Sequence, residues 1–203
     1  ICEGADYTIS TATASYASSI LWTHNGLGTL TNDNTLSPTY TPAAGETGVI
    51  TLTLTATSAS PCVDATDQMT ITITPAVVVN AGPDATICES GSYTLSGSAV
   101  ANASSLLWST SGTGTFNSYT ALHPVYTPSA ADIAAGSVTL TLTATPAAPC
   151  AAASDDMVLT ISRQATVSAG ADATICEGAD YTISTATASY ASSILWTHNG
   201  LGT

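Results

Sequence analysis

Basic residues are almost absent from this 203-residue chain, which has no lysine and a single arginine, Arg163. Its 14 acidic residues give a formal net charge of −13. Nucleic acids and anionic membrane surfaces are bound through clustered lysine and arginine, so we expect neither as a partner. Charged residues make up only 7% of the chain and hydrophobic residues 44%, a balance typical of packed domains and not of charge-rich disordered segments.

Long apolar runs and helical periodicity are also missing. No run approaches the length of a membrane span, so we expect no membrane insertion in this segment. The sequence starts without a methionine or a signal peptide, and we expect it to be a stretch of a longer, extracellular polypeptide. Because no segment keeps a helical period over a useful length, an all-β fold is expected.

A repeated unit of about 87 residues organises the chain. Residues 1–29 return unchanged as residues 175–203, and a diverged copy occupies residues 87–115. Each unit has the size of a small domain with one core. We predict three units: a first unit that lacks its first strand (1–75), a complete middle unit (76–163) and the N-terminal part of a third unit (164–203).

Alternating apolar and polar residues predict β-strands in each unit. Val49–Thr57 and Met69–Thr74 alternate in the first unit, and Ser137–Thr145 and Met157–Ser162 do so in the middle unit. The segment Pro38–Pro42 is bounded by prolines, which favours an edge strand. About seven short strands per unit favour a β-sandwich. Three tryptophans recur at one strand position and are interpreted as core anchors: Trp22, Trp108 and Trp196.

Five stretches of the middle unit carry a resemblance: AGPDATICE (81–89), LLWSTSGTGTF (106–116), PVYTPSAAD (124–132), GSVTLTLTAT (136–145) and DDMVLTIS (155–162). They resemble the PKD-like and immunoglobulin-like (Ig-like) tandem repeats of very large secreted surface proteins of gliding and biofilm-forming bacteria. The resemblance covers the whole chain. It implies an all-β fold of tandem Ig-like (PKD-like) β-sandwich domains stacked end to end.

The same resemblance implies a structural role outside the cell. The chain is then a segment of an extracellular fibre or stalk, rigidified by disulfides, whose partners are copies of itself or neighbouring repeats. The alternative is a spacer region of a cell-surface adhesin whose ligand-binding tip lies outside this sequence. Neither role needs a cofactor.

Five cysteines occupy two kinds of position: Cys2, Cys88 and Cys176 are equivalent, and so are Cys62 and Cys150. In an Ig-like sandwich the two kinds lie at opposite ends of a domain, separated by a strand about 23 Å long. A disulfide requires Cα atoms within about 7 Å, so we favour the interdomain pair Cys2–Cys150. The other cysteines then need partners in neighbouring units or chains. Intradomain pairs Cys2–Cys62 and Cys88–Cys150, or free thiols, stay open as alternatives.

Catalytic chemistry finds no support in the sequence. His24 aligns with Thr110, and His123 aligns with Ser37, so neither histidine recurs between units. No serine or carboxylate is placed to complete a triad with either of them. We therefore do not expect an enzyme.

Two kinds of candidate site remain. Asp67, Asp155 and Glu89 are candidate calcium ligands at a joint between units, although aspartates at a strand start more simply bond their own backbone. Asn102 opens the one N-glycosylation sequon, Asn102-Ala103-Ser104.

Strand donation between copies is a further alternative. The first unit lacks its leading strand, and residues 165–174 could supply one to a neighbouring copy. Residues 175–203 would then duplicate the neighbour's residues 1–29. An overlapping stretch of a continuous tandem polymer explains that identity more simply, and we favour it.

Overall fold

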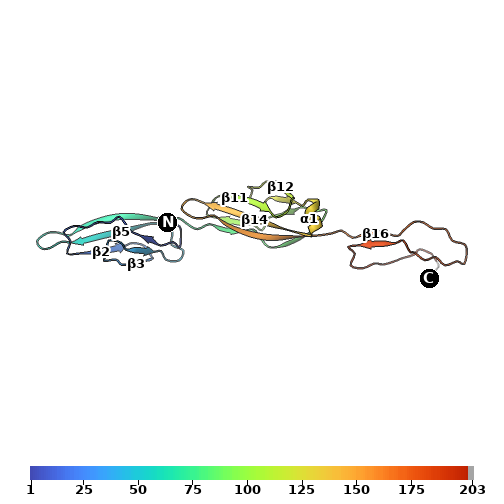
Figure 1. The fold of residues 1–203 in the computed structure, drawn as a ribbon, viewed down its shortest axis with the longest axis horizontal. Helices are drawn as coiled ribbons and strands as arrows, with labels where there is room; N and C mark the ends of the chain where they lie inside the picture. The colour runs from blue at the N-terminus through green and yellow to red at the C-terminus, as the bar shows by residue number, and fades with distance from the viewer. Residues whose placement is uncertain (201–203) are drawn as a thin grey trace.

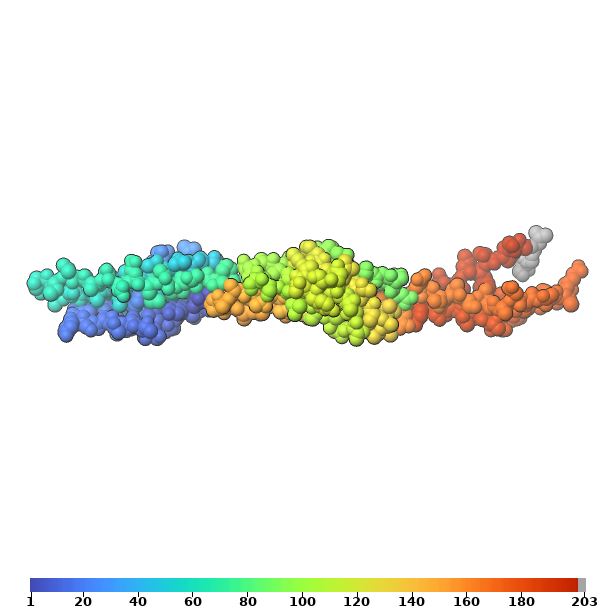
Figure 2. Space-filling model, turned by 90° about the horizontal axis from the view of Figure 1, so that it is seen from above, coloured from blue at the N-terminus to red at the C-terminus, as the bar shows by residue number. Residues whose placement is uncertain are grey.

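The computed structural model describes residues 1–200, which form an elongated row of three segments (Figure 1; Figure 2). The first unit contains β1 (Tyr7–Thr8), β2 (Ser19–His24), β3 (Thr29–Thr31), β4 (Thr39–Thr41), β5 (Gly48–Thr57) and β6 (Ala65–Ile73). The middle unit contains β7 (Val78–Asn80), β8 (Ala85–Cys88), β9 (Tyr93–Thr94), β10 (Ala99–Ala101), β11 (Ala103–Thr110), β12 (Thr115–Phe116), β13 (Val125–Thr127), α1 (Ala130–Ala135), β14 (Ser137–Pro146) and β15 (Ala153–Ser162). The third unit contains β16 (Thr166–Ser168) and β17 (Thr187–Ser189).

The first unit is a sandwich of two three-stranded sheets, in the orders β2-β5-β6 and β1-β4-β3. The alternation predicted for β5 is confirmed, because Ile50, Leu52 and Leu54 are buried while the threonines between them are partly exposed. Trp22 from β2 and Tyr40 from β4 complete the same core. The side chains of both sheets therefore meet in one apolar layer.

The middle unit has additional strands that the first unit lacks. Its β8 pairs in parallel with β15, so the larger sheet has the order β11-β14-β15-β8 and packs against β12-β13-β9. Trp108 and Leu142 from the larger sheet meet Phe116 and Tyr126 from the smaller sheet in the core. The chain is thus an all-β tandem of Ig-like β-sandwich units arranged end to end.

Residues 164–200 do not form a closed sandwich, because β16 and β17 are the only strands in this part of the described chain. Trp196, predicted as a core anchor, is 55% exposed, whereas Trp22 and Trp108 are buried as predicted. The strands that cover Trp22 in the first unit, β4 to β6, have no counterpart after Trp196 in this sequence.

Two local predictions need correction. The segment Pro38–Pro42 forms β4, which lies in the centre of its sheet and not at the edge. Its prolines flank the paired residues, so their missing N–H groups fall outside the ladder. The short helix α1 was not expected either. Ser129 caps its start, and Gly136 ends it with a φ of 80°, so capping residues and not periodicity define it.

Candidate functional site: the joints between units

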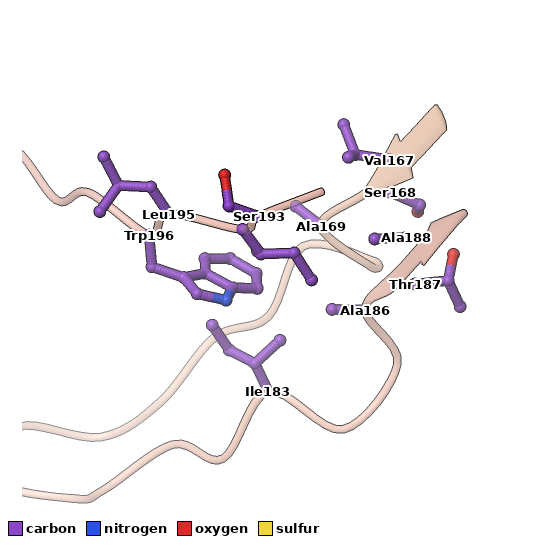
Figure 3. Close-up of a pocket in the computed structure, with 11 residues that line it drawn as sticks. Val167, Ser168, Ala169, Ile183, Ala186, Thr187, Ala188, Ser193, Leu195 and Trp196 are labelled. Atoms are coloured by element: carbon purple, nitrogen blue, oxygen red, sulfur yellow. The ribbon is translucent and has the colours of Figure 1, made fainter. Parts of the chain in front are cut away.

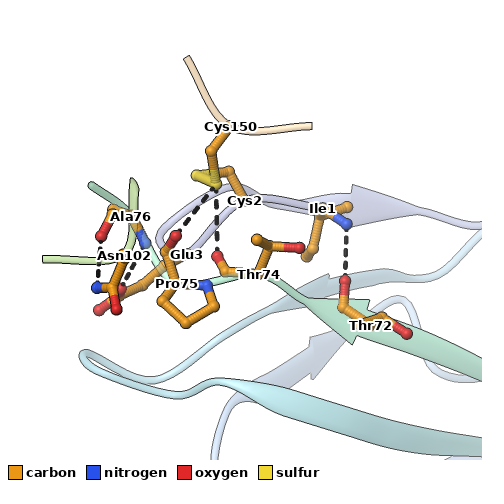
Figure 4. The surroundings of a disulfide bond; sticks show 9 residues. All are labelled: Ile1, Cys2, Glu3, Thr72, Thr74, Pro75, Ala76, Asn102 and Cys150. Carbon is orange, nitrogen blue, oxygen red and sulfur yellow. Dashed lines mark hydrogen bonds between the residues drawn. A yellow bond between two sulfur atoms is a disulfide. The ribbon is translucent and has the colours of Figure 1, made fainter. Parts of the chain in front are cut away.

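A disulfide closes the joint between the first and middle units (Figure 4). Cys2 precedes β1 and Cys150 lies in the loop between β14 and β15, yet their Cα atoms are 4.9 Å apart and their sulfur atoms are bonded. This is the interdomain pair that the sequence favoured. Because each cysteine forms one such bond, the intradomain pairs Cys2–Cys62 and Cys88–Cys150 do not form. A covalent bond therefore links two successive units.

Hydrogen bonds from both units hold the connecting residue Ala76. The Ala76 N–H donates to Oε2 of Glu3 in the first unit at 3.0 Å, and Nδ2 of Asn102 in the middle unit donates to the Ala76 carbonyl at 2.8 Å. Beside them, the backbone nitrogen of Ile1 donates to the Thr72 carbonyl at 2.8 Å. Side chains of both units satisfy the polar groups of the connecting residue, which restrains its backbone.

The joint between the middle and third units uses a different contact. Arg163 stands in the place of Pro75, and Tyr190 stands in the place of Asn102. The Arg163 guanidinium lies 4.9 Å from the centre of the Tyr190 ring and donates to the Tyr190 hydroxyl. Its Nη2 also donates to the Ala134 carbonyl at 3.2 Å. The single arginine of the chain thus connects the middle unit to the third.

Tyr16 occupies the equivalent position in the first unit. Tyr16, Asn102 and Tyr190 have φ values of 58°, 60° and 56°. A left-handed backbone is uncommon for residues other than glycine, so its recurrence shows that the three units present this side chain in the same way. Tyr16 is 101% exposed, and within residues 1–200 no arginine lies beside it.

Each sandwich also buries a carboxylate that the sequence analysis missed. In the middle unit, Asp132 accepts hydrogen bonds from the Tyr126 hydroxyl at 2.8 Å, from the N–H groups of Thr113 and Gly114 at 2.9 Å, and from the Ser129 N–H at 3.0 Å. Only 3% of Asp132 is exposed. No basic side chain takes part in this set of contacts.

Glu46 has the same role in the first unit. It accepts from the Tyr40 hydroxyl at 2.9 Å and from the N–H groups of Leu27 at 2.6 Å and Ala43 at 2.9 Å. In both units the acid follows the tyrosine by six residues. That recurring spacing was the sequence signal for this site, and it was overlooked because one unit has Glu where the other has Asp.

Both buried acids are ionised at neutral pH. Burial alone raises the pKa of Asp132, but the hydrogen bonds that it accepts outweigh burial and hold the pKa below its ordinary value. The same balance lowers the pKa of Glu46. Burial, together with the adjacent Asp132 carboxylate, raises the pKa of Tyr126 to about 12. Each tyrosine is therefore a neutral donor to a carboxylate.

The carboxylates considered as calcium ligands are not brought together. Oδ2 of Asp155 accepts from the Ala81 N–H at 2.8 Å, so it bonds the backbone of a distant segment and not its own, as the simpler interpretation had it. Asp67 is exposed on β6, and the Glu89 N–H donates to Ser162 beside the second joint. Among residues 1–200, no group of three or more His, Cys, Asp or Glu side chains is arranged to hold a metal ion.

An open hollow of about 500 Å³ lies in the third unit (Figure 3). Trp196 and Ile183 point toward each other across it, and Val167 and Leu195 line it. The equivalents of Ile183 and Trp196 in the first unit, Ile9 and Trp22, are buried in its core. The hollow is therefore an uncovered core and not a ligand site.

No protein-family model and no curated protein matches the sequence. Among solved structures, the I-band fragment I67-I69 from titin is 16% identical over 81% of this chain and 62% of its own, with a TM-score of 0.42. The mouse clustered PcdhgC3 EC1-3 structure is 12% identical over 79% of this chain and 62% of its own, with a TM-score of 0.37. The D00-D0 domain of intimin is 14% identical over 79% of this chain and 93% of its own, with a TM-score of 0.38. With TM-scores below 0.5, these likenesses add nothing to the sandwich topology that the strand pairing shows directly.

No helix of the described residues is long and apolar enough to cross a membrane.

Proposed function

We propose that the chain is a structural, non-enzymatic segment of an extracellular fibre or stalk. The observation that carries the proposal is the Cys2–Cys150 disulfide, which joins successive units covalently and so opposes both bending and pulling at the joint. Disulfides of this kind persist in oxidising compartments, which supports a location outside the cell. The net charge of −13 favours solubility in such a setting.

The connections between units support the same role. Unit boundaries near 75/76 and 163/164 leave almost no free linker, because β6 and β15 are followed closely by β7 and β16. At the first joint, Glu3 and Asn102 hold the connecting Ala76 from both sides. An array with short, restrained joints keeps its length under load, as a stalk or fibre requires.

Small-angle X-ray scattering of the chain, with its native disulfide and after reduction, tests the proposal. We expect a narrow distribution of lengths for the oxidised chain and a broader, more bent ensemble after reduction. A chain with Cys2→Ser and Cys150→Ser should resemble the reduced protein, whereas Cys176→Ser, at an exposed and unpaired cysteine, should not. Equal stiffness in all these samples would contradict a stiffening role for the disulfide.

A further inference from the structure

The outward face of the β2-β5-β6 sheet carries no charged side chain. Successive residues of a strand point to opposite faces, and Trp22, Leu54 and Ile71 point into the core, so their neighbours along each strand point outward. These outward residues are Ser19, Leu21, Thr23, Val49, Thr51, Thr53, Thr55, Thr57, Thr66, Gln68, Thr70 and Thr72. A chain with a net charge of −13 therefore has one broad neutral surface.

Two large apolar side chains are exposed on this neutral face. Leu21 is 49% exposed and Val49 is 62% exposed. Leu21 directly precedes Trp22, and in the middle unit Leu107, which is 53% exposed, directly precedes Trp108. The outward positions of a solvated sheet are ordinarily polar, so a leucine at the same outward position of two diverged units points to a contact surface.

The same face is also exposed in the complete sandwich of the middle unit. There β8 lies beside β15 in the same sheet and leaves the outward face uncovered, so Leu107 and Thr160 are exposed. A strand beside β6 would likewise widen the face of the first unit and not cover it. The opposite sheet of the first unit, β1-β4-β3, is much smaller, because its strands have two or three residues, and Asp6 and Asp33 adjoin it.

The middle unit carries one acid on its equivalent face. Asp156 is exposed on β15 opposite Thr141, where the first unit has Gln68 opposite Thr53. Nε2 of Gln68 donates to Oγ1 of Thr53 at 3.2 Å, so this position is occupied by a hydrogen-bonded amide. Burying an unpaired carboxylate in a contact is costly, so the face of the first unit is the better surface for a neutral contact.

We propose that the β2-β5-β6 face binds the same face of a second copy of the chain, so that chains associate side by side. The inference rests on the proposed fibre or stalk function and names its lateral partner. Two copies that each have a net charge of −13 repel each other, and a contact between them costs least where neither copy has a charge to desolvate. Pairing about a two-fold axis buries Leu21, Val49 and the threonine methyl groups of both copies between two aligned sheets.

The size of the face sets the strength of this contact. The ten residues of β5 span about 33 Å and three strands span about 14 Å, so the face measures about 460 Å². A stable interface needs about 800 Å² from each partner, so one pair of faces binds weakly, with a Kd of about 0.1–1 mM. Each further unit of an array that presents such a face adds to the binding, so long arrays associate tightly.

The full chain at concentrations from about 0.05 to 2 mM, a range that brackets the expected Kd, provides the test. Cys62→Ser, Cys88→Ser and Cys176→Ser in every sample prevent thiol cross-links and retain Cys2–Cys150. We expect sedimentation equilibrium to show a dimer and amide NMR shifts to change with concentration in β2, β5 and β6. Shifts confined to the third unit, or no association at all, would overturn the inference.

Salt dependence separates a neutral contact from one made by ion pairs. Raising the sodium chloride concentration from about 20 to 300 mM screens the repulsion between the copies, and we expect the Kd to fall at least about threefold. A contact held by ion pairs would weaken instead, and that result would contradict the proposal.

Two leucine substitutions form a matched pair. Leu21→Ser removes an apolar side chain of each copy from the contact, and we expect the Kd to rise at least about tenfold. Leu27→Ser should leave the Kd unchanged, because Leu27 is 83% exposed in the loop between β2 and β3, away from the face. Equal Kd values for the two variants would refute binding through this face.

Two added charges form a second matched pair. Gln68→Asp introduces the residue that the middle unit carries at the equivalent position, so the strand accepts it, and we expect the Kd to rise at least about tenfold. Thr41→Asp adds the same charge on β4 of the opposite sheet and should change the Kd less than about twofold. Equal effects would show that net charge and not this face controls association.

Unfolding curves of the four variants verify that each sandwich is intact. A chain that is stiff through its Cys2–Cys150 bond but does not associate would refute only the lateral contact. The proposed function would then still stand, because its scattering test measures the stiffness of single chains.

Discussion

Replacing Asp132 by asparagine tests whether a buried, unpaired carboxylate stabilises the middle sandwich. Four donors end on its two oxygens, three of them backbone N–H groups and the fourth the Tyr126 hydroxyl. In Asp132→Asn one oxygen becomes an NH₂ donor that faces another N–H, and the remaining bonds lose their charge. A hydrogen bond to a charged group contributes about 1.5–3 kcal/mol and a neutral one about 1 kcal/mol, so we expect the free energy of unfolding to fall by about 3–5 kcal/mol.

Urea unfolding monitored by tryptophan fluorescence provides the measurement. With Trp22 and Trp196 replaced by phenylalanine, Trp108 reports on the core of the middle unit alone. Tyr126→Phe removes one of the four donors and should cost about 1.5–3 kcal/mol, less than Asp132→Asn. A loss below about 0.5 kcal/mol for Asp132→Asn would refute the reasoning, because a surface substitution has that magnitude.

The pH dependence gives an independent check. Because folding lowers the pKa of Asp132, its contribution to stability is fully present above the unfolded value of about 4 and is lost as the pH falls through the folded value. Tyr126 behaves in the opposite sense: its contribution is present below about pH 10 and is lost as the pH rises toward about 12. Asp132→Asn should flatten the acid limb and Tyr126→Phe the alkaline limb. Parallel curves for variants and wild type would contradict both assignments.

The remaining predictions concern the first unit and the two joints. Glu46→Gln should lower the stability of the first unit by about 3 kcal/mol without changing the middle unit, as resolved by hydrogen exchange of separate peptides. Cys2→Ser with Cys150→Ser removes a cross-link that spans 148 residues and should lower the free energy of unfolding by up to about 5 kcal/mol, measured by urea unfolding. Arg163→Ala should speed amide exchange in β16 and β17, and Arg163→Lys should restore less than half of the protection because lysine lacks the planar guanidinium. Asn102→Asp places a carboxylate against the Ala76 carbonyl and should increase proteolysis at the first joint, while a glycan on Asn102, detectable by peptide mass, should do the same.

The strands could be predicted from the sequence because alternation follows directly from the pleat. Ile50, Leu52 and Leu54 lie on one side of β5 whatever the neighbouring strands do. Trp196 shows the limit of that logic, because burial depends on a second layer as well as on the residue. The position of β4 at the centre of its sheet depends on which strands pair with it, information that a local proline signal does not contain.

The candidate site divides in the same way. The Cys2–Cys150 pair could be predicted from the sequence, because opposite ends of one domain are too far apart for a disulfide. That argument needs only the length of the strand that separates the two ends. The Glu46 and Asp132 sites were not recognised, since an acid without a basic partner looks like a surface residue in sequence. Backbone N–H groups stabilise these carboxylates, and the sequence does not show where such groups converge.

The first and middle units differ along their whole length, and the differences at the joints bear on why the exact repeat spans two units. The sandwich cores change little, since Trp22 and Trp108 occupy equivalent buried positions. At the first joint an uncharged Pro75 lies beside Asn102, which donates to backbone. At the second joint the Arg163 guanidinium lies over the Tyr190 ring. An aromatic ring attracts a cation electrostatically, and it would not attract an uncharged proline in that way. The side chain at the entrance of the middle and third units thus matches the residue that ends the unit before it, which in the proposed fibre or stalk favours alternation of the two unit types.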